Sequence, residues 1–132
     1  MKITADTNVL VRALTGDDAR QCAVAQNLLA EADLVAITLP SLCELVWVLS
    51  RGYKISSSDI CEAIRKLVNS ANVVANLPAA EAGLAMLERG GDFADGVIVY
   101  EGRWLGAETF VSFDRKAVKL ALEQGEGAKL PA

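Results

Sequence analysis

The sequence contains no histidine and only three cysteines in 132 residues. Without histidine, the chain lacks the commonest general base, the usual serine and cysteine catalytic arrangements, and the ligands of most zinc enzymes. The cysteines are odd in number and widely spaced among apolar neighbours, which argues against disulfides and against a cysteine–zinc site; they are Cys22, Cys43 and Cys61. Any catalysis must therefore use carboxylates.

No apolar stretch reaches the roughly 18 residues that a membrane helix needs, although the hydrophobic fraction is 52% and the mean hydropathy is +0.30. The first residues carry no positive region followed by a long apolar stretch, so we expect no signal peptide and a cytoplasmic protein. The formal net charge of -4 argues against a general nucleic-acid coating protein, which would be strongly basic. The surplus of apolar residues predicts a core and a self-association face.

Short β-rich runs alternate with segments of helical spacing along the whole chain. Strands are predicted near residues 2–5, 34–38, 72–75 and 109–113, and the tail from 123 is expected either to fray or to carry a last strand near Leu130. Helices are predicted near residues 8–14, 19–32, 40–50, 59–69, 79–88, 92–105 and 115–122. This alternation predicts one α/β domain over residues 1–132, a three-layer α/β/α sandwich around a central parallel sheet.

Four acidic residues lie at or beside predicted helix starts: Asp6, Glu44, Asp95 and Asp114. Each has a simple structural explanation. Asp6 and Asp114 are suited to cap the helices that follow them, and Glu44 fits a capping box that begins at Ser41. Asp92 and Asp95 imitate the same box. Taken singly, capping explains each acid about as well as function does.

The four acids together are harder to explain by capping, since serine, threonine or asparagine would serve as well. Asp6 and Asp114 both follow apolar strands, and the carboxyl ends of parallel strands meet at one edge of a sheet. Four carboxylates ~5 Å apart would repel by about 3 kcal/mol per pair at an effective dielectric near 20, so the cluster predicts a bound cation. Mg²⁺ or Mn²⁺ fits, because both favour oxygen ligands. Such an ion polarises phosphoryl oxygens and activates water, which predicts phosphodiester hydrolysis.

Residues beside the acids are candidates for supporting contacts. Thr7, Asn8 and Ser112 are suited to bind metal-bound water or phosphate, but satisfying local backbone groups explains each at least as well. Arg115 and Lys116 directly follow Asp114 and are the better candidates for RNA phosphate contacts. The other cations near the acids could also contact RNA phosphates, but a solvated face explains them equally well; they are Arg12, Arg51 and Lys54.

The aromatic residues near the acids are Trp47, Tyr53 and Trp104. Aromatic side chains can stack on the bases of a single strand. Among apolar helix residues they more often belong to a core or a dimer interface, which is the interpretation that we favour.

Four segments carry a family resemblance, in an order and spacing that are specific together although each motif is short: Asp6–Arg12, Glu44–Leu49, Asp92–Asp95 and Thr109–Asp114. They resemble the PIN domain, specifically its VapC-like bacterial toxin branch, from about Ile3 to Val118. The resemblance implies a Mg²⁺- or Mn²⁺-dependent endoribonuclease with a Rossmann-like parallel sheet. Its acidic residues map onto Asp6, Glu44, Asp95 and Asp114, with Asp92 nearby as a further participant.

The toxin branch implies partners. Its members dimerise and are neutralised by an antitoxin whose C-terminal segment occupies the active-site groove and often presents arginine to the acids. The chain is thus expected to be the homodimeric toxin of a bacterial type II toxin–antitoxin pair. One position departs from the family pattern: Gly96 follows Asp95, where alanine or another small helix former is usual, and glycine weakens a helix by ~1 kcal/mol. This puts the orientation of Asp95 in question.

Two other functions remain as alternatives. A receiver-like domain with a phosphorylated aspartate also places acids at strand ends, but no lysine is expected at the end of a late strand to pair with the phosphate. A PIN-fold binding module would act mainly through its antitoxin complex, with little or no nuclease activity. The presence of all four acids disfavours pure binding.

Overall fold

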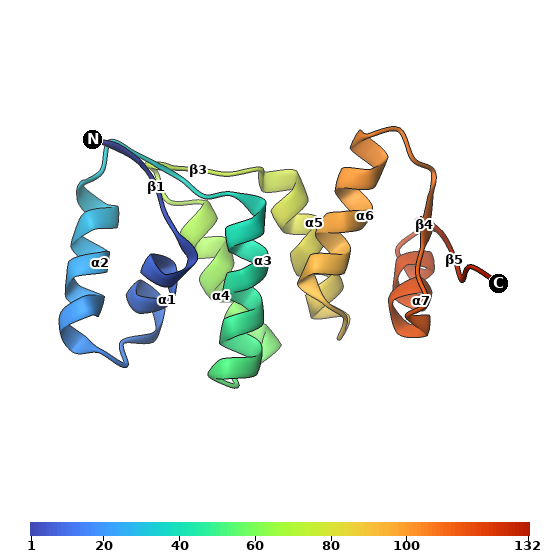
Figure 1. Ribbon diagram of the computed structural model, residues 1–132, viewed down its shortest axis with the longest axis horizontal. Helices are drawn as coiled ribbons and strands as arrows, with labels where there is room; N and C mark the ends of the chain where they lie inside the picture. The colour runs from blue at the N-terminus through green and yellow to red at the C-terminus, as the bar shows by residue number, and fades with distance from the viewer. The chain divides into compact units, whose positions relative to one another are not determined.

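The computed structural model describes residues 1–132, which divide into two compact units. Unit 1 is Met1–Asn76 and unit 2 is Leu77–Ala132 (Figure 1). None of the helices is both long enough and apolar enough to cross a membrane.

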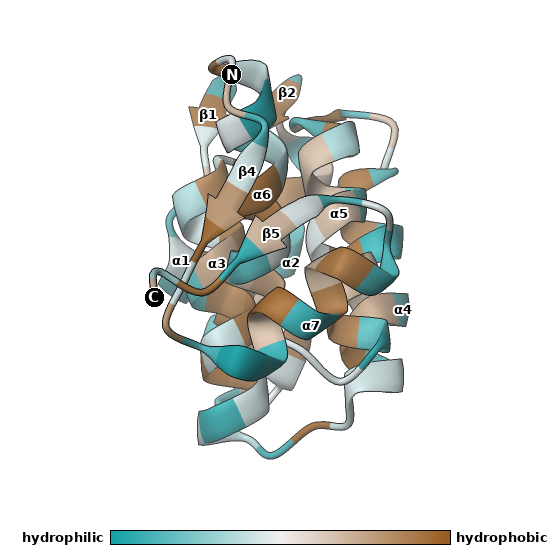
Figure 2. Cartoon of the chain, turned by 90° about the vertical axis from the view of Figure 1, so that its right-hand side faces the viewer, coloured by the Kyte–Doolittle hydropathy of each residue, from teal (hydrophilic) through white to brown (hydrophobic).

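Unit 1 is built on a parallel three-stranded sheet of order β1-β2-β3, with Ile3 opposite Val35 and Val35 opposite Val73. Figures 1 and 2 both show its helices on one side of these strands. The elements of unit 1 are β1 (Lys2–Thr4), α1 (Thr7–Thr15), α2 (Ala19–Glu31), β2 (Leu34–Ala36), α3 (Leu39–Trp47), the π-helical η1 (Val48–Gly52), α4 (Ser57–Val68) and β3 (Val73–Val74).

Apolar side chains at helical spacing form the core of unit 1. Leu10 of α1 is fully buried, as are Leu42 and Leu45 of α3, which lie three residues apart on one face. Helix α1 packs against both α2 and α3. These contacts hold the starts of α1 and α3 beside the carboxyl ends of β1 and β2.

Local capping explains where two of these helices begin. Asp18 caps α2, because its Oδ1 accepts a hydrogen bond of 3.0 Å from the Gln21 amide. The predicted capping box at Ser41 is wrong. Helix α3 begins three residues earlier, where Oγ1 of Thr38 accepts a hydrogen bond of 3.4 Å from the Ser41 amide, and Pro40 occupies its first turn.

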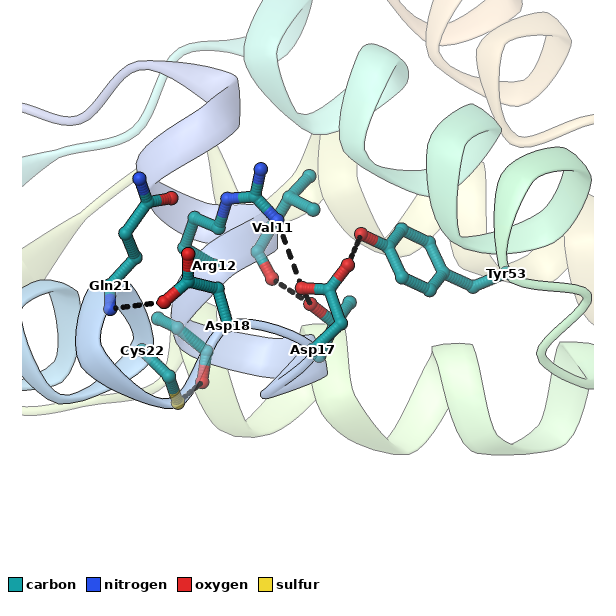
Figure 3. Close-up of polar contacts among 9 residues, drawn as sticks. Val11, Arg12, Asp17, Asp18, Gln21, Cys22 and Tyr53 are labelled. Atoms are coloured by element: carbon teal, nitrogen blue, oxygen red, sulfur yellow. Dashed lines mark hydrogen bonds and ion pairs between the residues drawn. The ribbon is translucent and has the colours of Figure 1, made fainter.

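A polar network joins the turn after α1 to the end of η1 (Figure 3). The Asp17 carboxylate accepts hydrogen bonds from Tyr53 Oη at 2.7 Å, Arg12 Nη1 at 2.9 Å and Thr15 Oγ1 at 3.1 Å. The turn of η1 closes with the Tyr53 amide donating to the Val48 carbonyl at 3.2 Å. Short π-helical turns interrupt helices mostly at functional sites, and this one delivers Tyr53 to the network.

Asp17→Asn is expected to lower the free energy of unfolding near pH 7, and this effect is expected to shrink as the pH falls below the usual aspartate value of 3.8. The hydrogen bond from Tyr53 lowers the pKa of Asp17 below its usual 3.8 more than partial desolvation raises it, and Thr15 and Arg12 lower it further. Because the folded pKa is below the unfolded one, the stabilisation is present above the unfolded pKa and is lost as the pH falls through the folded pKa. Urea denaturation of both chains across this range measures the difference, and an effect independent of pH would contradict the network.

Unit 2 contains two parallel strands and three helices, and Figure 2 shows brown and teal residues alternating along α7. Met86 of α5 packs with Leu120 and Ala121 of α7 into a small core against Phe110 and Ala128 of the two strands. The elements of unit 2 are α5 (Leu77–Glu88), α6 (Phe93–Trp104), β4 (Thr109–Val111), α7 (Arg115–Glu123) and β5 (Gly127–Lys129).

Helices α5 and α6 lie side by side in Figure 1 and approach closely at two glycines. A Cβ atom built on Gly96 would lie 2.4 Å from the Ala82 carbonyl oxygen, and one on Gly83 would lie 2.6 Å from the Phe93 ring. Neither site has room for a methyl group. The glycine after Asp95, which weakens the helix in isolation, is therefore what lets α6 pack against α5.

The seven α-helices and the parallel sheet confirm the predicted α/β class and fit the α/β/α architecture. The predicted strand near 109–113 is shorter than expected, and the tail carries the expected last strand as β5 rather than fraying. One argument from the sequence is wrong: β5 ends at Lys129, so a lysine does end a late strand.

Candidate functional site

Asp6 follows β1 directly and is the N-cap residue of α1. The Ala5 amide donates to the Ala36 carbonyl at 3.0 Å, so β1 remains paired with β2 up to the residue before the acid. Although Asp6 has extended cap backbone, with φ -75° and ψ 156°, its side chain makes no capping hydrogen bond. The carboxylate is exposed. Helix capping by the side chain, the simple structural explanation for an aspartate at this position, is therefore wrong for Asp6.

Glu44 lies in the second turn of α3, well past the Thr38 cap. A glutamate at this position cannot reach back to the cap amide, so the capping-box explanation fails here too. The side chain is exposed. Since α3 packs against α1, unit 1 brings the helices that carry Glu44 and Asp6 into contact.

Two acids of unit 2 do serve as caps. Asp92 begins α6, and its Oδ1 accepts a hydrogen bond of 3.0 Å from the Ala94 amide. Asp114 begins α7 and accepts a hydrogen bond of 3.1 Å from the Ala117 amide. Each of these carboxylates retains a second oxygen for another ligand.

Asp95 lies half-buried in the first turn of α6, which Asp92 caps. Burial raises the pKa of its carboxyl above the usual 3.8, and the negative charges of Asp92 and Asp114 raise that pKa further. Unit 2 therefore brings three acids into electrostatic contact, and the field that they create at Asp95 is one that a cation would relieve.

The neighbouring residues differ in how far local structure explains them. Thr7 is 8% exposed, whereas Asn8 is exposed. Ser112 Oγ accepts a hydrogen bond of 3.0 Å from the Asp114 amide, so a local backbone role is confirmed for it. Arg115 and Lys116 are exposed in the first turn of α7.

The tryptophans are not core residues. Trp47 is 60% exposed and Trp104 is 74% exposed, which contradicts a core position for either. The indole Nε1 of Trp104 donates to the Tyr100 hydroxyl at 2.8 Å. An interface or a stacking role remains open to both.

A groove that was not predicted from the sequence lies between α1 and α2, and its lining begins at Asn8, two residues after Asp6. It has a volume of about 690 Å³, and its lining includes Asn8, Arg12, Arg20 and Gln21. The signal in the sequence would have been Arg20, a cation in the first turn of a helix that carries no first-turn acid.

The donors suit a hard divalent cation, because all are carboxylate oxygens and those of Asp6 and Glu44 are not used in caps. Within neither unit do three or more histidine, cysteine, aspartate or glutamate side chains form a group that would hold a metal ion. Unit 1 supplies Asp6 and Glu44, whereas unit 2 supplies Asp95 and Asp114. That all four bind one ion stays a prediction.

Comparison with known proteins identifies the family. The model of the PIN domain matches residues 3–122, a span that covers most of both units. PIN domains are α/β folds that are in general metal-dependent nucleases. No curated protein matches the chain. Because the match extends over far more than half of the sequence, the chain belongs to the PIN domain family.

Proposed function

We propose that the chain is a Mg²⁺- or Mn²⁺-dependent endoribonuclease in which Asp6, Glu44, Asp95 and Asp114 bind the metal. Both units would form one PIN domain, which the family match across residues 3–122 supports. The observation that carries the proposal is the carboxylate of Asp6, which stands at the end of β1 without a capping hydrogen bond. Membership of the PIN family disfavours the receiver-like alternative.

The chain's own residues provide the setting for hydrolysis. A bound divalent cation would polarise the scissile phosphoryl oxygen and lower the pKa of an attacking water. Asp95 would remain ionised beside the cation although burial opposes its charge in the metal-free chain. Asp92 would add negative charge next to Asp95 while it caps α6.

Arg115 and Lys116 would hold the RNA strand through its phosphates. Both are exposed in the first turn of α7, where the helix dipole is also positive. Asn8 and Thr7, next to Asp6, would position metal-bound water, with Ser112 fixing the backbone before Asp114. Because its RNA substrate is cellular, the protein would act in the cytoplasm.

In this proposal the protein is the toxin of a bacterial type II pair and binds an antitoxin. A groove of about 590 Å³ between α1, α2 and α4 supports such a partner. Its lining includes the apolar Leu14, Leu29 and Leu67, the acids Asp59 and Glu62, and Lys66, which pairs with Glu62 at 3.6 Å. A helix with one apolar face and a basic residue opposite Asp59 complements that surface.

Homodimerisation would bury exposed apolar side chains. Trp47 in unit 1 and Trp104 in unit 2 are both mostly exposed, and exposed aromatic residues are typical of interfaces.

The second candidate function is a binding module with little or no nuclease activity, which would act mainly through its antitoxin complex. The groove between α1, α2 and α4 is the observation that favours it.

The purified chain is expected to cleave single-stranded RNA with Mg²⁺ or Mn²⁺ and to stop when EDTA is added. The chemistry is assigned to the metal that the four carboxylates bind, so it is lost when the cation is removed. Gel analysis followed by sequencing of the RNA ends measures both the rate and the cleavage position. Cleavage that continues at the same rate in EDTA would contradict the metal mechanism, and no cleavage with either ion would favour the binding module.

A further inference from the structure

The groove between α1 and α2 is a concave surface next to the proposed metal site. Asn8, at its α1 side, lies two residues after Asp6, and Arg12 lies one turn further along the same face of α1. Arg20 and Gln21 line it from the first turn of α2. A ligand in this groove would therefore run from the Asp6 carboxylate along the two helices.

The charged groups of this groove favour an anion. Arg12, Arg20 and Asp18 line it, and Arg12 is already paired with Asp17, so Arg20 is the arginine of the groove without a salt bridge. The Asp18 side chain already accepts the capping hydrogen bond from the Gln21 amide.

Arg20 is exposed, and it takes part in no salt bridge. It occupies the second position of α2, where the helix dipole disfavours a cation. Helix stability therefore does not explain an arginine here, and its guanidinium is available to a negatively charged ligand.

Arg12 is held in place for the same ligand. Its Nη1 donates to Asp17 at 2.9 Å, and Asp17 is fixed in turn by the Tyr53 hydroxyl at 2.7 Å. Figure 3 shows the other terminal nitrogen of Arg12 directed away from Asp17. An oriented guanidinium with free N–H groups matches the geometry of a phosphate.

We propose that the α1–α2 groove binds the phosphodiester backbone of single-stranded RNA, with Asn8 nearest to the proposed metal site and Arg12 and Arg20 contacting phosphates further along the strand. The choice of RNA rests on the proposed function. The apolar Val24 and Leu28 in the same groove offer surface to a ribose or a base edge. The groove thus sets the direction in which the strand leaves the cleavage site.

Fluorescence anisotropy with a labelled single-stranded RNA of about 12 nucleotides tests the proposal. The buffer contains EDTA, so that no metal ion cleaves the RNA or links it to the carboxylates. Arg20→Gln is expected to weaken binding about tenfold and to reduce the slope of log K against log salt by about 0.7. Arg89→Gln, which removes the same charge from an exposed position at the end of α5, is expected to change neither. Thermal melts establish that both variants are folded.

Equal behaviour of Arg20→Gln and Arg89→Gln, or no measurable RNA binding by the unsubstituted chain, overturns the proposal. So does a loss of affinity in Arg20→Gln for polyglutamate but not for RNA, which would make the groove a peptide site. Cleavage with Mg²⁺ together with Arg20-independent binding would reject this groove and leave the nuclease function standing. Arg20-dependent binding without cleavage in the presence of any divalent ion would support the groove and reject the nuclease function.

Discussion

Asp6→Asn is expected to reduce the rate of RNA cleavage by at least about a hundredfold and to leave the fold unchanged. The substitution removes a negative charge and one metal-ligand oxygen from the end of β1. Because the Asp6 side chain makes no capping hydrogen bond, no stabilising contact is lost with it. The rate with Mg²⁺ and the urea denaturation midpoint of the same preparation measure the two effects separately.

The matched control for this variant is Asp33→Asn. Asp33 is also an exposed aspartate of unit 1, and its side chain pairs with the amino group of Met1 rather than with any proposed ligand. The Asp33→Asn variant is expected to cleave RNA at the rate of the unsubstituted chain. Cleavage by Asp6→Asn at that same rate would show that the nuclease mechanism proposed here is wrong.

Gly96→Ala is expected to destabilise the protein by about 1–3 kcal/mol, the usual range for an inserted methyl group that a packed site cannot accept. The new Cβ would lie 2.4 Å from the Ala82 carbonyl oxygen and 2.8 Å from the Gly83 Cα. Both are backbone atoms of α5, so relief requires the two helices to separate. The gain of about 1 kcal/mol in helix propensity from glycine to alanine offsets only part of this cost.

Gly102→Ala provides the comparison within the same helix. A Cβ on Gly102 would meet nothing within 4 Å, so the helix-propensity gain is expected to appear undiminished, as a stabilisation of about 0.5–1 kcal/mol. Urea denaturation of the two variants should therefore shift in opposite directions. Stabilisation by both would contradict the close packing of α6 on α5. Because Asp95 precedes Gly96, Gly96→Ala should also impair cleavage more than Gly102→Ala does.

The sequence predicted the elements well where the signal was local. Asp114 marked the start of α7 because an acid before an amphipathic segment is both a cap and a boundary. The capping box at Ser41 failed for a reason that is also local. Thr38 and Pro40 form an equally good helix start three residues earlier, and the two patterns overlap.

Features that depend on hydrogen bonds between residues further apart in the sequence, or on tertiary contacts, could not be predicted in this way. The apolar run before η1 suits an α-helix as well as a π-helix, and only the bond from the Tyr53 amide to the Val48 carbonyl distinguishes them. By helix propensity alone, Gly96 is unfavourable in α6. Its reason lies in the Ala82 carbonyl, on another helix.

The candidate acids were predicted from their positions, and the structure gives each a different local state. Asp6 and Glu44 are not used in caps, Asp114 is, and Asp95 carries a raised pKa because of burial and its acidic neighbours. Helical periodicity could not predict these differences, since they depend on which backbone amide lies within reach of each carboxylate. The meeting of Asp6 with Asp114 depends on contacts between distant segments and stays a prediction.

The central claim is that carboxylates of both units bind one divalent cation. Anomalous diffraction from a crystal of the full chain grown with Mn²⁺ tests it most directly. The proposal predicts a manganese peak about 2.1 Å from oxygens of Asp6 and of at least one of Asp95 and Asp114. A well-ordered structure with no such peak, or with manganese bound to carboxylates of one unit alone, would contradict it.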